Sequence, residues 1–312
     1  MPSADRTMPG VHQRPLGKTG LSVGAIAFGC WRFAGVDVAT AAGRIETALD
    51  AGMTLIDTAD VYGLDNDCEW GAAEALLGEV LAINPSLRDR IVLATKGGIQ
   101  LERGIGFGVP YDSSATGIRE ACEASLRRLQ TDRIDLYQIH RPDLLAHPAE
   151  VASALTDLVI SGKVRFVGVS NHSAAQVRAL LAHLDVPLAT VQPELSVAHL
   201  DPFDDGVLDQ AMELGLTPLA WSPLAGGRLV ADPAPDTRIA TIQSVLDELA
   251  EIHGSTRTAI ALAFLLAHPA GVIPIVGTGR PDRILEAAAA SDISLAKDDC
   301  YRLIAAAGRV LP

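Results

Sequence analysis

The sequence predicts an α/β fold in which eight strand–helix units close into a (β/α)8 TIM barrel preceded by a β-hairpin. Short apolar runs alternate with helix-like stretches along almost the whole chain, and this alternation calls for a parallel sheet. Eight such units in 312 residues fit one barrel, so we expect residues 1–312 to form a single domain. The first strand is followed by Gly29-Cys30-Trp31-Arg32, which lacks the GxGxxG pattern expected of the alternative, an open doubly wound sheet.

The elements follow from local patterns, taken in chain order. Arg14 to Phe28 contains two short strands around Gly17-Lys18-Thr19-Gly20, a turn-rich hairpin. The barrel strands are the apolar runs expected at 25–28, 54–57, 91–95, 134–139, 164–168, 188–191, 217–220 and 272–276. Helices are expected at 40–51, 68–82, 114–129, from 148, 173–184, 206–214, 256–267, 281–289 and 298–307.

Several helices carry their own start signals or spacing. Ile118, Ala121 and Ser125 recur at helical spacing. Pro148 is a residue favoured in a first helical turn, and Ser173 is a plausible N-cap. The stretch 231–236 is expected to be a loop within an insertion that follows the seventh strand.

Composition excludes several classes of protein. The net charge is -13, from 25 basic and 38 acidic residues, which argues against a nucleic-acid partner. Hydrophobic residues make up 48% of the chain, yet no apolar run is long enough to span a bilayer. The first residues lack the apolar core of a secretory signal, and the four cysteines form no CxxC pair. We therefore expect a cytoplasmic protein with no metal site and no membrane association.

Four polar residues follow three successive predicted strands. Asp57 and Tyr62 come after the second barrel strand, Lys96 after the third and His140 after the fourth. The carboxyl ends of parallel strands share one edge, so these side chains are expected to converge. A phenol, an amine, a carboxylate and an imidazole at one point make a proton-donating site.

The motifs around these residues resemble those of the aldo-keto reductases. The segments that carry the resemblance read Asp57-Thr58-Ala59-Asp60-Val61-Tyr62-Gly63, Ala94-Thr95-Lys96, Ile139-His140-Arg141-Pro142, Gly168-Val169-Ser170-Asn171 and Trp221-Ser222-Pro223-Leu224. The opening hairpin also matches, and the resemblance runs in order from about residue 14 to residue 290. The HRPD and WSPLAGGRL segments place it nearest to bacterial oxidoreductases.

Proton transfer to a reduced carbonyl explains the four catalytic residues. Tyrosine is a weak acid with a reference pKa of about 10. We expect the Lys96 ammonium to lower the pKa of Tyr62, which makes Tyr62 the general acid. Asp57 would orient Lys96, and His140 would donate a hydrogen bond to the carbonyl oxygen.

The resemblance implies NADP(H) as the hydride donor, bound without a dinucleotide-binding domain. It implies that Ser170, Asn171 and Gln192 bind the carboxamide and that Trp221 stacks on the nicotinamide. Arg280 and Arg283 would pair with the 2′-phosphate. The remaining expected cofactor-binding residues are Trp31, Ser222, Pro223, Leu224, Gly226, Gly227, Arg228, Gly277, Thr278, Gly279, Glu286 and Ala287, of which Trp31 would form an apolar wall and Ala287 departs from the asparagine of many members.

The sequence thus predicts an NADP-dependent reductase of aldehydes or ketones, reversible toward alcohols, whose partner is a small carbonyl or alcohol substrate and whose form is a monomer or a homo-oligomer. Two alternatives stay open. One is a cofactor-sensing accessory subunit with little turnover, and the other is a lyase that uses Lys96 as a Schiff-base amine. The glycine-rich stretch 98–114 is expected to be a lid over the barrel mouth.

Overall fold

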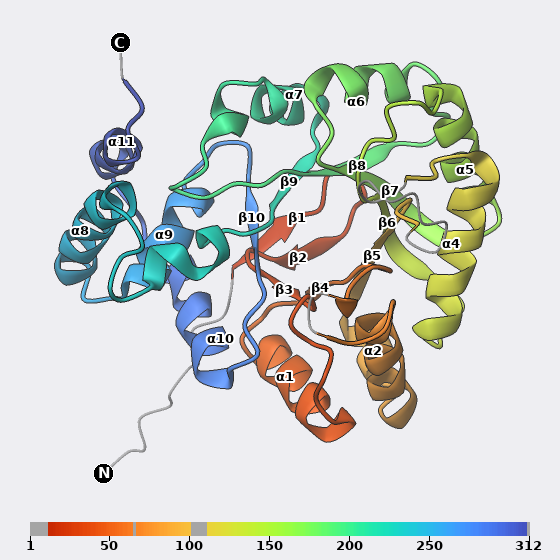
Figure 1. Cartoon of the computed structure of the whole chain (residues 1–312), viewed down its shortest axis with the longest axis horizontal. Coiled ribbons are helices and arrows are strands. Elements are labelled where there is room, and N and C mark those ends of the chain that lie inside the picture. The colour runs from red at the N-terminus through yellow and green to blue at the C-terminus, as the bar shows by residue number, and fades with distance from the viewer. Residues whose placement is uncertain (1–11, 65–66, 101–110, 311–312) are drawn as a thin grey trace.

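The computed structural model describes residues 12–64, 67–100 and 111–310, and eight parallel strands in it close into a barrel (Figure 1). The strand order around the barrel is β10-β3-β4-β5-β6-β7-β8-β9, so neighbours in the chain are neighbours in space. Their bounds are β3 (Ala27–Gly29), β4 (Leu55–Asp57), β5 (Val92–Gly97), β6 (Ile134–Ile139), β7 (Val164–Ser170), β8 (Leu188–Gln192), β9 (Thr217–Ala220) and β10 (Ile273–Val276). The predicted barrel is confirmed.

Helices surround the strands, and their starts follow the signals in the sequence. They are α1 (Val38–Asp50), α2 (Ala72–Ile83), α3 (Leu87–Arg90), α4 (Ala115–Arg128), α5 (Pro148–Ile160), α6 (Ala174–Leu181), α7 (Val207–Leu214), α8 (Thr237–Ile252), α9 (Arg257–Leu266), α10 (Pro281–Ala288) and α11 (Lys297–Ala306). Ser173 caps α6 through a capping box with Gln176, and Pro148 opens α5. In the part of the chain that the structure describes, no helix is long and apolar enough to cross a membrane.

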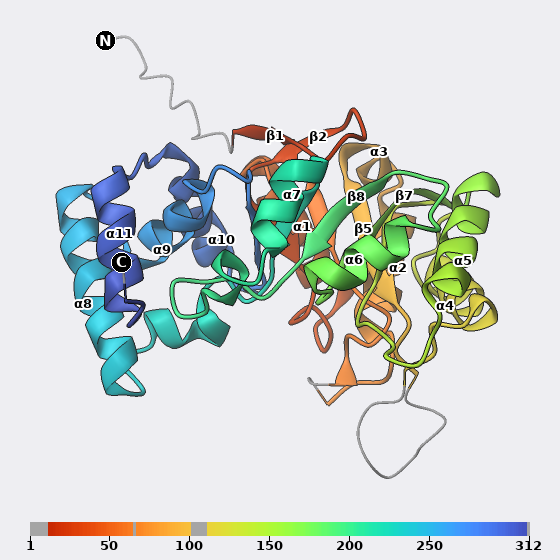
Figure 2. The same cartoon turned by 90° about the horizontal axis from the view of Figure 1, so that it is seen from above.

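Helix α8 is an element that the sequence interpretation missed. It lies within the insertion after β9, and Asp236 caps its first turn by accepting from the Ile239 amide. Its buried residues Ile242, Leu246 and Leu249 recur at helical spacing and pack with α9 and α11 (Figure 2). The insertion is therefore largely helical.

The positions 101–110 of the expected lid lie outside the described residues.

The hairpin of β1 (Gln13–Pro15) and β2 (Ser22–Gly24) covers one end of the barrel (Figure 2). Leu16 in its turn is fully buried and joins the apolar side chains inside the barrel, among them Leu55 and Leu136. The Gly17 amide donates to the Thr217 hydroxyl at 2.6 Å. This end of the barrel is apolar and closed, so polar chemistry is left to the opposite end.

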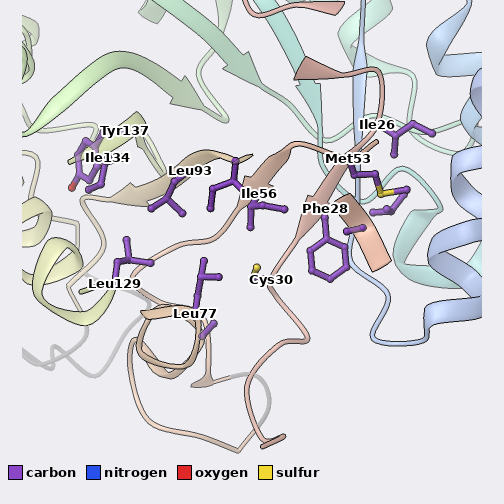
Figure 3. Packing of buried hydrophobic residues seen from close by; sticks show 14 of the residues in the cluster. Ile26, Phe28, Cys30, Met53, Ile56, Leu77, Leu93, Leu129, Ile134 and Tyr137 are labelled. Atoms are coloured by element: carbon purple, nitrogen blue, oxygen red, sulfur yellow. The ribbon is translucent and has the colours of Figure 1, made fainter. Parts of the chain in front are cut away.

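A second apolar layer lies between the strands and the surrounding helices. In Figure 3 it includes Phe28, Ile56 and Leu93 from the strands and Leu77 from α2. Successive strand residues point to opposite faces, so Ile56 and Leu93 face this layer while Asp57 and Ala94 face the barrel interior. Apolar side chains therefore pack on both faces of the strands. This packing fixes the backbone positions from which the side chains at the carboxyl ends project.

Candidate active site

Asp57, Lys96 and His140 lie at the carboxyl ends of three adjacent strands. Asp57 is the last residue of β4 and pairs in register with Ala94 of β5. Lys96 pairs with Gln138 of β6, and His140 follows the end of that strand. Tyr62 comes five residues after Asp57, in the segment before α2. The structure brings together the four residues that the sequence picked out.

Lys96 is the centre of this group. Its side chain is 1% exposed, and its Nζ donates to Asp57 Oδ2 at 2.6 Å, to the Thr58 carbonyl at 2.9 Å and to the Tyr62 hydroxyl at 3.2 Å. An ammonium group has three protons, so each one has an acceptor. Burial lowers the pKa of Lys96, but Asp57 and Tyr62 outweigh it and the pKa is raised from its ordinary value. Lys96 is therefore a cation at neutral pH.

The pKa of Tyr62 differs from the sequence-based expectation. Burial raises it, the Lys96 charge lowers it, and burial prevails, so the net shift is upward rather than downward. The expected effect of Lys96 is present, but desolvation of the phenolate is larger. At neutral pH Tyr62 keeps its proton and can donate it.

His140 is neutral beside this pair. Burial lowers its pKa well below the ordinary value, and the charges of Lys96 and Arg141 lower it further. Its ring lies 5.9 Å from the Tyr62 ring in an edge-to-face arrangement. The buried Nδ1 of His140 has no hydrogen-bond partner among the described residues. A neutral imidazole next to a proton donor can orient a carbonyl oxygen by donating one hydrogen bond.

Gln192, Ser170 and Asn171 connect to the same group. The Gln192 amide donates to Asp57 Oδ1 at 3.1 Å, and the Ser170 hydroxyl donates to the Gln192 carbonyl at 2.9 Å. Asn171 has a left-handed backbone (φ 60°), and its amide donates to the His140 carbonyl at 3.0 Å. Trp221 Nε1 donates to Asn171 Oδ1 at 2.9 Å. Strands β4, β6, β7 and β8 and the turn after β9 thus share one hydrogen-bonded network.

The turn after β9 presents backbone that a ligand could approach closely. Ser222, Gly226 and Gly227 all have positive φ, and the Ser222 hydroxyl accepts from the Gly226 amide at 2.8 Å. A Cβ added at Gly226 or Gly227 would meet no heavy atom within 4 Å. Arg228 lies in the same turn and pairs with Asp236 at 2.5 Å, while Pro223 and Leu224 precede the glycines. Backbone of this kind fits the approach of a pyrophosphate.

The turn between β10 and α10 carries the expected anion-binding residues. Gly277, Thr278 and Gly279 lead to Arg280, whose guanidinium makes a bidentate ion pair with Asp282 (2.5 and 3.1 Å). Arg283 and Glu286 lie in the first two turns of α10, whereas Ala287 is buried in the core. Trp31, 40% exposed beside Arg32, lies in the turn after β3.

Arg44 is a residue at this turn that sequence reasoning missed. It comes from α1, and its guanidinium lies so close to Gly279 that a Cβ there would be 2.9 Å from Arg44 Cζ. No motif marks this arginine, because only the packing of α1 against α10 brings it to the turn. Within residues 12–64, 67–100 and 111–310, no three acidic, His or Cys side chains gather to hold a metal ion.

Comparison with known proteins identifies the family of this chain. The family model described as the aldo/keto reductase family matches residues 25–307, so the chain belongs to the aldo/keto reductase family and is an oxidoreductase. A 6-dehydroglucose reductase of Novosphingobium aromaticivorans is 51% identical over 303 residues, covering 96% of this chain and 97% of that protein. A 6-dehydroglucose reductase of Agrobacterium fabrum is 37% identical, covering 91% of this chain and 94% of that protein.

Solved structures show the same architecture. The glycerol dehydrogenase of Gluconobacter oxydans superimposes with a TM-score of 0.81 at 28% identity, covering 94% of each chain. Aldo-keto reductases act on small molecules and generally use a nicotinamide cofactor.

Proposed function

We propose that this enzyme reduces an aldehyde or ketone with NADPH, with Tyr62 as the proton donor. The observation that carries the proposal is the Lys96 ammonium, which lies between Asp57 Oδ2 (2.6 Å) and the Tyr62 hydroxyl (3.2 Å). Reduction of a carbonyl leaves an alkoxide, which needs a proton at near-neutral pH. Tyr62 is protonated there, and Lys96 stabilises the phenolate that remains after transfer.

His140 supplies the second polar contact to the substrate in this proposal. Its neutral imidazole donates a hydrogen bond to the carbonyl oxygen and so holds that oxygen toward Tyr62. In the reverse direction the Tyr62 phenolate takes the proton of an alcohol. Because the pKa of Tyr62 is raised, we expect alcohol oxidation to be favoured at higher pH than carbonyl reduction.

The cofactor-binding residues are proposed on the geometry of the same network. When bound, NADPH supplies the hydride for the carbonyl carbon. Ser170, Asn171 and Gln192 would hold its carboxamide, and Trp221 would stack on its ring. The glycines after β9 would face the pyrophosphate, and Arg280 with Arg283 would bind the 2′-phosphate and favour NADP(H) over NAD(H).

The substrate we propose is 6-dehydroglucose, a hexose with an aldehyde at carbon 6. Two relatives that this chain matches over more than nine tenths of their length carry that activity in their names. An aldehyde on a polyhydroxylated sugar suits a site in which one proton donor and one neutral hydrogen-bond donor face the carbonyl.

The lyase alternative is disfavoured by the state of Lys96. Schiff-base formation needs a neutral amine with an available lone pair. Here the amine is a buried ammonium with three acceptors and a raised pKa. Such a group is suited to electrostatic stabilisation rather than to nucleophilic attack.

A direct assay tests the proposal. Purified enzyme is mixed with NADPH and 6-dehydroglucose, and the loss of reduced cofactor is followed beside a panel of simple aldehydes and ketones. We expect turnover with 6-dehydroglucose that is at least tenfold slower with NADH, and Tyr62→Phe should abolish it while still binding NADPH. Tight cofactor binding without turnover on any carbonyl would favour a sensing role, and full activity of Tyr62→Phe would show that the proton donor is another group.

A further inference from the structure

The outer side of strand β5 carries a buried polar cluster that the proposed chemistry does not use. Glu74, in the first turn of α2, is fully buried and accepts from Thr95 Oγ1 at 2.5 Å and from Arg128 Nε at 2.7 Å. Thr95 is the residue before Lys96, so the two side chains leave the strand on opposite faces. Glu74 therefore holds from outside the strand that presents Lys96 to the inside.

The same turn of α2 also holds the Tyr62 segment. The Ala73 amide donates to the Tyr62 carbonyl at 3.1 Å, and the Asp60 amide donates to the Lys96 carbonyl at 3.1 Å. Helix α2 thus contacts the backbone of Tyr62 through Ala73 and the strand of Lys96 through Glu74. These contacts set the relative placement of the two segments that carry the phenol and the amine.

The ion pair between Glu74 and Arg128 fits inside the protein because a glycine lies beside it. A buried carboxylate needs a paired charge, and Arg128, at the end of α4, supplies it. Gly71 precedes α2 with a left-handed backbone (φ 75°), and a Cβ there would lie 2.5 Å from Arg128 Cδ and Nε. Leu77, Leu93 and Leu129 belong to the apolar layer between α2, β5 and the end of α4 (Figure 3). Glu74 and Thr95 are fully buried, and the Arg128 side chain is 22% exposed, so the cluster lies mostly inside the protein.

We propose that Glu74 is a positioning residue that sets the separation between the Tyr62 hydroxyl and the Lys96 amine. The Lys96–Tyr62 contact of 3.2 Å is the longest of the three that Lys96 makes, whereas its 2.6 Å bond to Asp57 lies within the barrel interior. Loss of the Glu74–Thr95 bond is expected to let the Tyr62 segment shift while the Asp57–Lys96 pair stays in place. The inference rests on the proposed role of Tyr62 as the proton donor.

Thr95→Val is the sharpest test, because it removes only the hydroxyl that Glu74 binds. Thr95→Ser restores a hydroxyl, and Thr217→Val is a matched control that removes a buried hydroxyl from β9 at the hairpin end of the barrel. The readouts are crystal structures, the dissociation constant for NADPH, kcat, and the pH midpoint of alcohol oxidation.

We expect Thr95→Val to move Tyr62 beyond 3.5 Å from Lys96 and to lower kcat about tenfold, with NADPH affinity within about twofold. The pH midpoint of alcohol oxidation should rise by about half a unit, because Lys96 then stabilises the phenolate less. Thr95→Ser should restore the wild-type distance and midpoint. Thr217→Val should lower the melting temperature without changing the distance or the midpoint.

Two outcomes separate this inference from the proposed function. If Tyr62→Phe is inactive while Thr95→Val keeps the wild-type distance, kcat and midpoint, the role of Glu74 is wrong and the proton donor stands. If Tyr62→Phe stays active, the proposed donor is wrong, and the crystallographic distance in Thr95→Val still decides whether Glu74 sets the placement.

Should Thr95→Val fail to fold, Glu74→Gln is the second variant. It keeps an acceptor for Thr95 but loses the attraction to Arg128, and a smaller change in the same direction is expected. An unchanged distance and midpoint in that variant would also contradict the inference.

Discussion

The side-chain amide of Gln192 donates a hydrogen bond of 3.1 Å to Oδ1 of Asp57, across 135 residues of sequence. The other carboxylate oxygen of Asp57 accepts from Lys96. Asp57 therefore divides its two oxygens between the Lys96 amine, which is proposed to act on Tyr62, and Gln192, which is proposed to bind the nicotinamide. This one carboxylate thus links Gln192 to Lys96, and Lys96 in turn donates to the Tyr62 hydroxyl.

Asp57→Asn should break the buried ion pair at its centre. It leaves the Lys96 ammonium without its main counter-charge, and removal of one partner from a buried pair costs about 3 kcal/mol or more. We expect a lower pKa of Lys96, a kcat reduced at least a hundredfold and a lower melting temperature. Asp37→Asn, at the exposed cap of α1, is the control, and it should change only stability and only slightly.

The stability of the protein should depend on His140 in the acid range. Burial holds the pKa of folded His140 well below its ordinary value of 6.5, so the unfolded chain binds its proton first. Stability from this residue is complete above about pH 6.5 and is lost as the pH falls below that value. In His140→Gln the free energy of unfolding should vary less between pH 7 and pH 5. If the free energy of unfolding, measured by urea titration, changes equally between pH 7 and pH 5 in both proteins, this prediction is wrong.

Asp60 should make the stability of the protein depend on pH in the opposite direction to His140. It is buried with one oxygen lacking a partner among the described residues, and burial together with Glu74 raises its pKa well above 3.8. The folded state binds the proton more tightly, so stability is complete below about pH 4 and declines as the pH rises through the folded pKa. Asp60→Asn should melt at a higher temperature than wild type at pH 8, with a smaller gain at pH 5. A variant that is less stable at pH 8 would show that the carboxylate is ionised and paired.

Cofactor selectivity should reside in Arg280 and Arg283. If both guanidinium groups contact the 2′-phosphate, the double change to alanine should weaken NADPH binding about tenfold or more while NADH binding stays within twofold. Asp282→Asn should strengthen NADPH binding, because it removes the carboxylate that competes for Arg280. Binding of both cofactors is measured by quenching of tryptophan fluorescence. Parallel losses for NADPH and NADH would place the 2′-phosphate elsewhere.

Local sequence patterns predicted the fold and much of the site. Alternating apolar runs placed all eight barrel strands, and parallel strands that share an edge explain why Asp57, Lys96 and His140 meet. Ser173 and Pro148 marked helix starts that the structure confirms. Helix α8 was missed because no element was assigned to the insertion beyond the loop at 231–236, although Ile242, Leu246 and Leu249 keep helical spacing.

Tertiary structure decided what depends on distance and on burial. The bond from Gln192 to Asp57 and the approach of Arg44 to Gly279 follow from closure of the barrel and from the packing of α1 on α10. The upward pKa shift of Tyr62 arises because desolvation outweighs the Lys96 charge. For Glu74, the sequence predicted its place in a helix, but only the tertiary structure brings it into contact with the strand of Lys96. Periodicity is a local property that a sequence displays directly, whereas electrostatic balance depends on neighbours that only the folded chain brings together.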